Sequence, residues 1–379
     1  MTKIILTSTI PLSLNLFCKG WFRELERSGY EVVAVSSPGS DLKAIEEREG
    51  VRTYAVKMYR YITPFRDLKS LWSLIKVFRK ERPRMVHSIT PKAGLLAMMA
   101  AWIARVPVRV HTFTGLVFPY SSGLRRMILM TTDRLTCLFA THIIPEGEGI
   151  KADLQRFRIT RKPLNVLGHG NVRGIDLNYY DPEDPTVKEK AAALKSEGTF
   201  TYIFIGRMVG DKGVNELVAA FRKLNAGYPD TRLLLVGWEA DMDPLERTTE
   251  EEIRRNDAIT YAGYQEDVRP WLLASDVLVL PSYREGFPNV VIEAGAMGLP
   301  SIVTDVNGSN EIVVEGRNGM IVPPRNTEEL YAAMVEMLLR GDKNREMRLR
   351  TRKMVTDRYE QIYVRRCKKE YYREILSDK

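Results

Sequence analysis

The chain has 379 residues, 44 % of them hydrophobic and 28 % charged, which excludes a disordered or fibrous protein and allows two or three domains with sizeable cores. Its three cysteines are scattered singly, which argues against a disulfide framework or a cysteine-metal site and favours a reduced, cytoplasmic protein. The net charge of +9 is uneven: residues 1–180 hold 28 basic and 14 acidic side chains, whereas residues 181–379 hold 29 and 34.

In the first part of the chain, β-rich apolar runs alternate with helical patterns. Thr, Ser and Asn interrupt the opening run, so we interpret it as a buried strand and a loop rather than a signal peptide. The longest unbroken apolar run, residues 94–104, is too short to span a bilayer, so no transmembrane helix is predicted. The pattern predicts strands at 3–7, 31–37, 85–89 and 108–113, and helices around 18–28, 67–80 and 94–105.

The alternation starts again after residue 200. Strand and helix in turn predict a parallel sheet flanked by helices, so the expected fold class is α/β, with two Rossmann-like domains facing each other across a cleft. We interpret the polar stretch 181–190, with its two prolines, as the edge of a linker. The expected domains are therefore 1–180 and 181–357, followed by a C-terminal helix at 358–379 that packs back on the first domain. The second series has strands at 201–206, 232–237, 276–282 and 301–305, and helices around 214–224 and 289–297.

The first candidate site is GRMVGDKG, Gly206–Gly213, between a predicted strand and a predicted helix. Gly206 would allow a sharp turn, and Arg207 and Lys212 beside a helix N-terminus suit a diphosphate. The stretch is not a Walker loop, because Asp211 stands where the second glycine should be. No GxGxxG follows the first strand, which disfavours a dinucleotide dehydrogenase. A plain surface turn is the alternative interpretation.

The second candidate site is PSYREGFPNVVIEAGAMGLP, residues 281–300. Glu285 follows a strand, Pro288 and Asn289 suit the start of a helix, and Glu293 falls in its first or second turn. A carboxylate can accept hydrogen bonds from two hydroxyls, which suits the vicinal diols of a ribose or a hexose. The alternative is a glutamate that only caps the helix.

This second string resembles the E-x7-E signature of retaining glycosyltransferases with the GT-B fold, the large family that includes sucrose synthase and bacterial polysaccharide transferases. GRMVGDKG is similar to the phosphate loop of that family, and GNVRGIDL, residues 170–177, to its segment before the interdomain linker. HSITPKAG at 87–94 and HTFTG at 111–115 are similar to N-domain segments of members that build capsules, O-antigens and other surface glycans. The similarity spans nearly the whole chain.

The resemblance implies a role for each matching residue. Arg207 and Lys212 would hold the diphosphate, Glu293 the ribose, and Glu285 would face the sugar. His111, alone among four histidines, would reach the sugar from the first domain. The implied catalytic residues are Glu285, His111, Arg207 and Lys212. The implied donor-binding residues are Gly206, Arg207, Lys212, Tyr264 near the base, Glu285, Gly286, Phe287, Pro288, Asn289 and Glu293.

Members of this family retain anomeric configuration and need no metal, so the resemblance implies no metal ligand and no cofactor. A UDP-sugar is the expected donor, with GDP as the alternative nucleotide. Two departures stand out. The first loop, Thr7–Leu14, lacks the glycine pair that many members have there, and Asp241 and Asp243 match a metal motif of a different glycosyltransferase fold.

The basic first half of the chain suggests where the acceptor comes from. Residues 51–100 hold 11 basic and 2 acidic side chains, a balance that attracts nucleic acid, anionic lipid or phosphorylated substrates. An amphipathic helix in this stretch, or the segment 124–135, would lie on an anionic membrane surface and receive a lipid-diphosphate-linked sugar. The protein would then be cytoplasmic and peripheral on the inner membrane face. Ordinary core-facing helices are the alternative. The first helix carries Leu71, Trp72, Ile75 and Phe78.

Two other functions remain open at this point. A sugar-nucleotide epimerase or a phosphorylase shares the two-domain architecture. A basic nucleic-acid-binding protein is the non-enzyme alternative, but the sequence has no helix-turn-helix or zinc signature, so no nucleic-acid partner is expected.

Overall fold

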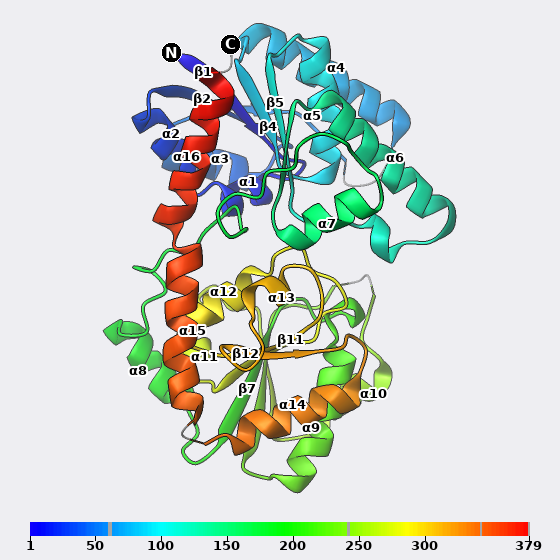
Figure 1. Cartoon of the computed structure of the whole chain (residues 1–379). Helices are drawn as coiled ribbons and strands as arrows, with labels where there is room; N and C mark the ends of the chain where they lie inside the picture. The colour runs from blue at the N-terminus through cyan, green and yellow to red at the C-terminus, as the bar shows by residue number, and fades with distance from the viewer. Residues whose placement is uncertain (60–62, 241–242, 342, 378–379) are drawn as a thin grey trace. The chain divides into compact units, whose positions relative to one another are not determined.

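The computed structural model describes residues 1–59, 63–240, 243–341 and 343–377. The chain divides into two compact units (Figure 1). The first unit consists of Met1–Gly174 together with Ile362–Lys379, and the second is Ile175–Gln361.

The first unit is built on a six-stranded parallel sheet with the order β3-β2-β1-β4-β5-β6. Its inner strands are apolar without alternation, as in Ile4–Leu6, because helices cover both faces of the sheet. The strands are β1 (Thr2–Thr7), β2 (Tyr30–Ser36), β3 (Arg52–Ala55), β4 (Met85–Ser88), β5 (Val108–Phe113) and β6 (His142–Pro145).

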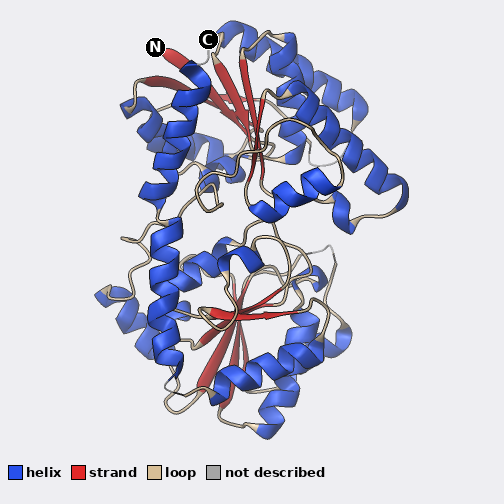
Figure 2. Ribbon diagram, viewed as in Figure 1, coloured by secondary structure: helices blue, strands red, loops and turns tan. Residues whose placement is uncertain are grey.

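Two sets of helices flank this sheet (Figure 2). The predicted helix around 18–28 is shorter than expected, because Gly20, with φ 72°, separates α1 from α2. On one face lie α1 (Pro11–Phe17), α2 (Trp21–Arg27), α3 (Ser40–Glu49) and the C-terminal α16 (Gln361–Ser377). On the other face lie α4 (Pro64–Glu81), α5 (Pro91–Ile103), α6 (Gly123–Phe139) and α7 (Glu148–Arg156), with a 3-10 turn η1 (Phe118–Tyr120) before α6.

The second unit repeats the architecture with a six-stranded parallel sheet of order β12-β11-β10-β7-β8-β9. The predicted α/β class with two Rossmann-like parallel sheets is therefore confirmed. The strands are β7 (Phe200–Ile205), β8 (Thr231–Val236), β9 (Ile259–Gly263), β10 (Val277–Leu280), β11 (Ser301–Thr304) and β12 (Gly319–Val322). The helices are α8 (Pro185–Leu194), α9 (Val214–Gly227), α10 (Arg247–Arg255), α11 (Arg269–Leu273), α12 (Asn289–Ala296), α13 (Ser309–Ile312), α14 (Thr327–Leu339) and α15 (Lys343–Tyr359), with a 3-10 turn η2 (Gly210–Lys212) before α9.

The passage from the first unit to the second falls a few residues before the boundary expected at 180. Ile175 already belongs to the second unit, where its N–H donates to the carbonyl of Tyr359 at 2.8 Å. Within the stretch 181–190, which we expected to be the edge of a linker, helix α8 begins at Pro185. The Asp184 carboxylate caps this helix by accepting two N–H groups of its first turn at 2.9 and 3.3 Å.

The C-terminal helix α16 belongs to the first unit. Its residues Tyr371, Tyr372 and Ile375 are buried in the core beneath it. The Tyr372 hydroxyl also forms a hydrogen bond with the Nδ1 atom of His87 on β4. The end of the chain therefore completes one face of the first sheet.

Candidate functional site

The two predicted motifs follow neighbouring strands of the second sheet. Strands β7 and β10 pair in parallel, and the strand order reverses between them, since β8 and β9 lie to one side and β11 and β12 to the other. Ligands of open parallel sheets bind at such a reversal, at the carboxyl ends of the strands. The loop after β7 is Gly206–Gly213, and the loop after β10 leads into α12. The N–H of Tyr283 donates to the carbonyl of Asp211 at 2.9 Å and joins the two loops.

Two glycines allow other backbone segments to approach the loop after β7 closely. Gly213 has φ 71°, and a Cβ atom there would lie 2.1 Å from the carbonyl oxygen of Pro281. A Cβ atom on Gly237, which follows β8, would lie 1.7 Å from the carbonyl oxygen of Gly206. In the loop after β7, the residue with a left-handed backbone conformation is Gly213. We expected Gly206 to make the sharp turn, but its backbone is not left-handed.

The predicted cation and the predicted carboxylate of the site bind each other. The Nζ atom of Lys212 lies 2.5 Å from Oε1 of Glu285. Their side chains are only 19 % and 11 % exposed, so little water screens the pair. The contact fixes the direction of both side chains between the two loops. Because an ammonium group has three donors, Lys212 can bind a further acceptor without leaving Glu285.

Two arginines share the carboxylate of Asp211. Arg284 donates to its Oδ2 atom through Nη2 at 2.6 Å and Nε at 3.1 Å. Arg207 lies on the other side, with Nη2 3.8 Å from Oδ1. Sequence reasoning treated Asp211 only as a departure from a Walker loop and overlooked Arg284, although this arginine lies within the second motif next to Glu285. The loops therefore hold three cations and two carboxylates that partly neutralise them.

The structure describes only one member of the acidic pair that matches a metal motif. Asp241 lies outside the described residues. The Asp243 carboxylate accepts the N–H of Asp211 at 2.6 Å, and its carbonyl accepts the N–H of Gly210 at 3.0 Å. Asp243 thus shapes the loop after β7.

The start of α12 presents a positive helix end beside these charges. Pro288 is the N-cap and makes no side-chain capping bond. The preceding backbone is held in place by Gly308, whose φ is 75° and whose added Cβ would lie 2.3 Å from the Gly286 carbonyl oxygen. Phe287 is buried and stacks edge-on with Tyr359 at 5.7 Å between ring centroids. The helix dipole and this fixed backbone favour a negatively charged or hydroxyl-rich ligand.

The remaining donor-binding residues of the second unit lie on α12 and after β9. Asn289 and Glu293 are four residues apart on α12, so their side chains share one helix face. Tyr264 follows β9 and pairs edge-on with Trp238, which follows β8, at 5.8 Å between ring centroids. Both rings are at least half exposed. Trp238 escaped the sequence analysis, because its partner becomes apparent only when β8 and β9 are known to be neighbours.

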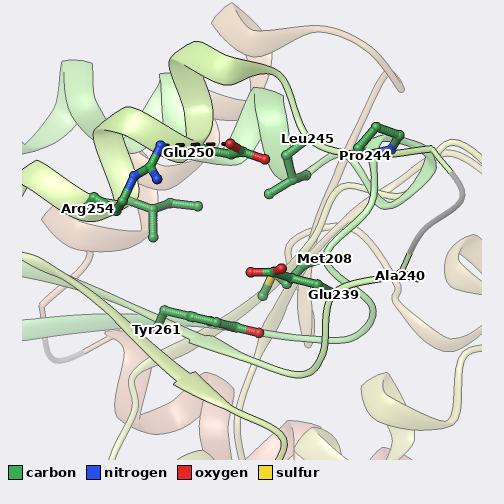
Figure 3. Close-up of a pocket in the computed structure, with 9 residues that line it drawn as sticks. Met208, Glu239, Ala240, Pro244, Leu245, Glu250, Arg254 and Tyr261 are labelled. Atoms are coloured by element: carbon green, nitrogen blue, oxygen red, sulfur yellow. Dashed lines mark ion pairs between the residues drawn. The ribbon is translucent and has the colours of Figure 1, made fainter.

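A cavity of about 280 Å³ lies between helix α10 and the segment that follows β8 (Figure 3). The Tyr261 hydroxyl donates to the carbonyl of Gly237 at 3.3 Å at its edge. Within the described part of the chain, none of the predicted site residues lines this cavity, so it adjoins the site without containing it. Its lining residues are Met208, Glu239, Ala240, Pro244, Leu245, Glu250, Ile253, Arg254 and Tyr261.

His111 belongs to the first unit, near the end of β5. It is 1 % exposed, and its Nδ1 atom lies 2.8 Å from the Ser88 hydroxyl oxygen. Helix α5 packs against the ring so closely that a Cβ atom on Gly94 would lie 2.4 Å from Cε1. Burial lowers the pKa of His111 from 6.5 to about 3, so the imidazole is neutral at physiological pH. In this unit His111 is a buried, hydrogen-bonded histidine.

The glycine-free first loop also lies in the first unit, after β1. The Thr9 hydroxyl lies 2.8 Å from that of Thr90 and accepts the N–H of Ala93 at 3.0 Å. Because Ala93 lies in the first turn of α5, Thr9 satisfies a helix N–H that a bound phosphate would otherwise contact. The Thr9 side chain thus occupies the space beside this helix start that a phosphate would need in order to approach the backbone.

No group of three His, Cys, Asp or Glu side chains in the part of the chain that the structure describes could hold a metal ion. Likewise, none of the helices that the structure describes is long and apolar enough to cross a membrane.

The chain is similar to known proteins in sequence and in fold. The family described as glycosyl transferases group 1 matches residues 199–340, and the glycosyl transferase 4-like domain matches residues 16–170. A capsular polysaccharide biosynthesis glycosyltransferase, CapM, of Staphylococcus aureus is 30 % identical over 345 residues, which are 91 % of this chain and 89 % of that protein. An Escherichia coli α-1,3-galactosyltransferase, whose name gives UDP-Gal as donor and α-D-GlcNAc-diphosphoundecaprenol as acceptor, is 28 % identical over 76 % of this chain and 75 % of its own. The crystal structure of Anabaena HepE in complex with UDP superposes with a TM-score of 0.80 at 17 % identity, covering 99 % of this chain and 100 % of that one.

Proposed function

The chain belongs to the group 1 glycosyltransferases, and we propose that it transfers a sugar from a UDP-sugar to a lipid-diphosphate-linked sugar, with retention of anomeric configuration and without a bound metal. It is a glycosyltransferase of the GT-B fold. The observation that carries the proposal is the group of three cations at the strand reversal of the second sheet, beside the start of α12.

The cations suit the diphosphate of the donor. Arg207, Arg284 and Lys212 offer several N–H donors, and the two carboxylates of Asp211 and Glu285 neutralise only two of these three positive charges, so the loops keep a positive charge for a diphosphate. Charge builds on the diphosphate as the glycosidic bond breaks. Cations fixed in advance therefore stabilise the transition state more than the bound donor.

The sugar and the ribose would contact the second loop and α12. Glu285 would accept sugar hydroxyls while it keeps its bond to Lys212, and the backbone N–H groups of Gly286, Phe287 and Asn289 would donate. Pro288 has no N–H and would contribute only shape. Glu293 would accept the ribose hydroxyls from the same face of α12 as Asn289.

The base would stack on the exposed aromatic pair of Trp238 and Tyr264. Aromatic side chains stack on the π-face of a base, which contributes affinity but does not discriminate between one base and another. UDP is the proposed nucleotide because the E. coli relative is named for UDP-Gal and the Anabaena structure holds UDP.

In the proposed reaction, the donor's C1–O bond to the diphosphate breaks and UDP leaves. The acceptor hydroxyl attacks C1 from the same face, and its proton passes to the departing phosphate oxygen, so no side chain needs to become a covalent nucleophile. A lipid-diphosphate-linked acceptor is proposed because the E. coli relative is named for one, and it would place the enzyme peripherally on the inner membrane face.

The test uses purified protein and a panel of nucleotides and UDP-sugars. UDP should raise the melting temperature, since a ligand that binds the native state stabilises it. UDP should be released from the correct donor only when an acceptor is added. Release without acceptor, or conversion of one nucleotide sugar to another, would favour the epimerase alternative.

A further inference from the structure

A groove of about 760 Å³ opens at the amino edge of the first sheet, where its strands begin. The starts of β1, β4 and β5 meet there: the N–H of Arg84 donates to the Lys3 carbonyl at 2.9 Å, and the N–H of Val108 donates to the Arg84 carbonyl at 3.1 Å. Helices α4 and α5 also end at this edge, because each leads the chain back to the next parallel strand. We call this cavity the amino-edge groove. The first loop and His111 lie at the opposite edge of the same sheet.

The charged side chains that line the amino-edge groove are all basic: Lys3, Arg79, Arg82, Arg84 and Arg105. Lys3 is already neutralised, since its Nζ atom lies 2.8 Å from Glu81 and 3.1 Å from Glu31. The side chains of the four arginines form no hydrogen bond, ion pair or aromatic contact with any residue that the structure describes. At the donor loops, by contrast, each of the three cations has a carboxylate within 3.8 Å. The amino-edge groove therefore keeps four uncompensated positive charges.

The two helix ends explain why positive charge gathers at this edge, but they do not use the N–H donors of the arginines. Arg82 is the C-cap of α4, and Arg105 follows the C-cap of α5. The carbonyl end of a helix carries partial negative charge, so nearby cations stabilise it. Neither guanidinium group, however, donates to a carbonyl among the described residues. Their N–H donors therefore stay available to a ligand.

Free guanidinium groups around a cavity of this size favour a phosphorylated small molecule. Each guanidinium presents a planar fork of N–H donors that fits a phosphate group through two hydrogen bonds. Four positive charges are balanced by several phosphates in a chain better than by a single anionic group. The volume of the groove is that of a small-molecule site, and Ala104 and Pro107 add an apolar part to its lining.

From these observations we infer that the amino-edge groove binds a soluble molecule that carries a chain of phosphates. Arg82, Arg84 and Arg105 come from the segments that meet at the groove and contact the phosphates, and Arg79 reaches them from the last turn of α4. The site belongs to the first unit, whereas the donor loops belong to the second. It is thus a second anion site, and it does not depend on the proposed transfer reaction.

The test is calorimetry of the full chain with inorganic tripolyphosphate, in the presence of saturating UDP to occupy the donor loops. Tripolyphosphate should bind at a single site, and its affinity should fall as salt is added, because salt screens exposed charges. The triple variant Arg82→Gln, Arg84→Gln, Arg105→Gln should bind tripolyphosphate at least about tenfold more weakly, because it loses three charged donors to phosphate.

The matched control Arg125→Gln, Arg222→Gln, Arg350→Gln removes the same charge from three exposed positions outside the groove and should bind tripolyphosphate as the unchanged protein does. Three results would overturn the inference: no binding by the unchanged chain, full binding by the groove variant, or an equal loss in the control. An oligoglutamate peptide that binds more tightly than tripolyphosphate, and loses this binding in the groove variant, would assign the groove to an acidic protein segment and also overturn it.

Melting temperatures with and without UDP show whether each variant is folded and whether its donor site is intact. A groove variant that melts at a lower temperature but binds tripolyphosphate as before would show that the arginines act only on the helix ends, against the inference. If UDP failed to raise the melting temperature of the unchanged chain, the donor site would be contradicted, while the comparison of the two triple variants would still test the groove.

Discussion

The two sheets have the same strand order, yet the loops at their reversal points are built from different chemistry. In the first unit the loops after β1 and β4 are joined by neutral hydroxyls, with Thr9 bound to Thr90 and to the first turn of α5. In the second unit the loops after β7 and β10 are joined by charges, with Lys212 on Glu285 and Arg284 on Asp211. One scaffold thus offers a neutral, internally satisfied edge and a charged edge suited to a diphosphate. The comparison predicts that substitutions in the second site change activity more than stability, and that substitutions around the first change stability.

The largest expected effect is that of Lys212→Ala. Losing one preorganised donor to a developing negative charge costs about 10²–10³ in turnover, with little change in melting temperature. Initial rates of UDP release with donor and acceptor measure this effect. The control Lys223→Ala removes an exposed lysine paired with Glu328 and should leave the rate unchanged. Full activity of Lys212→Ala, or of Arg207→Ala, would contradict the proposal that these two residues bind the donor diphosphate.

Trp238→Ala should weaken the binding of UDP. Stacking on an aromatic side chain contributes about 1–3 kcal/mol per base, so the dissociation constant should rise by about tenfold. Isothermal titration calorimetry gives the value directly. Trp102, equally exposed on α5 of the first unit, provides the matched control as Trp102→Ala. Unchanged affinity in the Trp238 variant would place the base elsewhere.

Gly94→Ala tests the close packing around His111 in the first unit. The new methyl group would lie 2.4 Å from the imidazole, and overpacking of this kind costs about 1–3 kcal/mol of unfolding free energy. Urea unfolding measures the loss. Gly227→Ala, at the end of α9 with nothing within 4 Å of the new Cβ, should be neutral or stabilising by under about 1 kcal/mol. Equal unfolding free energies of the two variants would show that α5 can shift to accommodate the new methyl group without loss of stability.

The smallest expected effect is on the pH dependence of stability. Because burial lowers the pKa of His111 from 6.5 to about 3, the unfolded chain binds a proton in that range and the folded chain does not. Unfolding free energy therefore falls as the pH falls below 6.5, and His111→Gln should make this slope shallower. His87, whose pKa is also lowered, chiefly by burial, is present in both proteins. The measurement is urea unfolding between pH 4 and 7. If unfolding free energy depended on pH with the same slope in the unchanged protein and in His111→Gln, the conclusion that His111 is buried and neutral would be contradicted.

Much of the fold could be predicted because it depends on local patterns. Apolar strands alternating with amphipathic helices indicate parallel sheets wherever they occur, and both motifs follow strands of the second sheet as expected. The boundary at 174 was missed, because the pairing of Ile175 with Tyr359 joins residues far apart in sequence. The exposed side of α4 was also mistaken, because Trp72 is exposed whereas Phe78 is buried, and helical period alone does not say which apolar residues face the core.

The candidate site was predictable in its parts but not in its contacts. Glycine spacing and flanking strands identified Arg207, Lys212 and Glu285, but their arrangement depends on β7 and β10 being neighbours. The bond between Lys212 and Glu285 joins residues 73 positions apart, which no local pattern encodes. Arg284 was overlooked for the same reason, because its role follows from Asp211 in the other loop.

The most direct measurement of the central claim compares the affinities of UDP and uridine by calorimetry, in the unchanged protein and in Lys212→Ala. If the cations at the second strand reversal hold the diphosphate, UDP binds far more tightly than uridine, and most of that difference disappears in the variant. A difference that stays the same in Lys212→Ala would contradict the account.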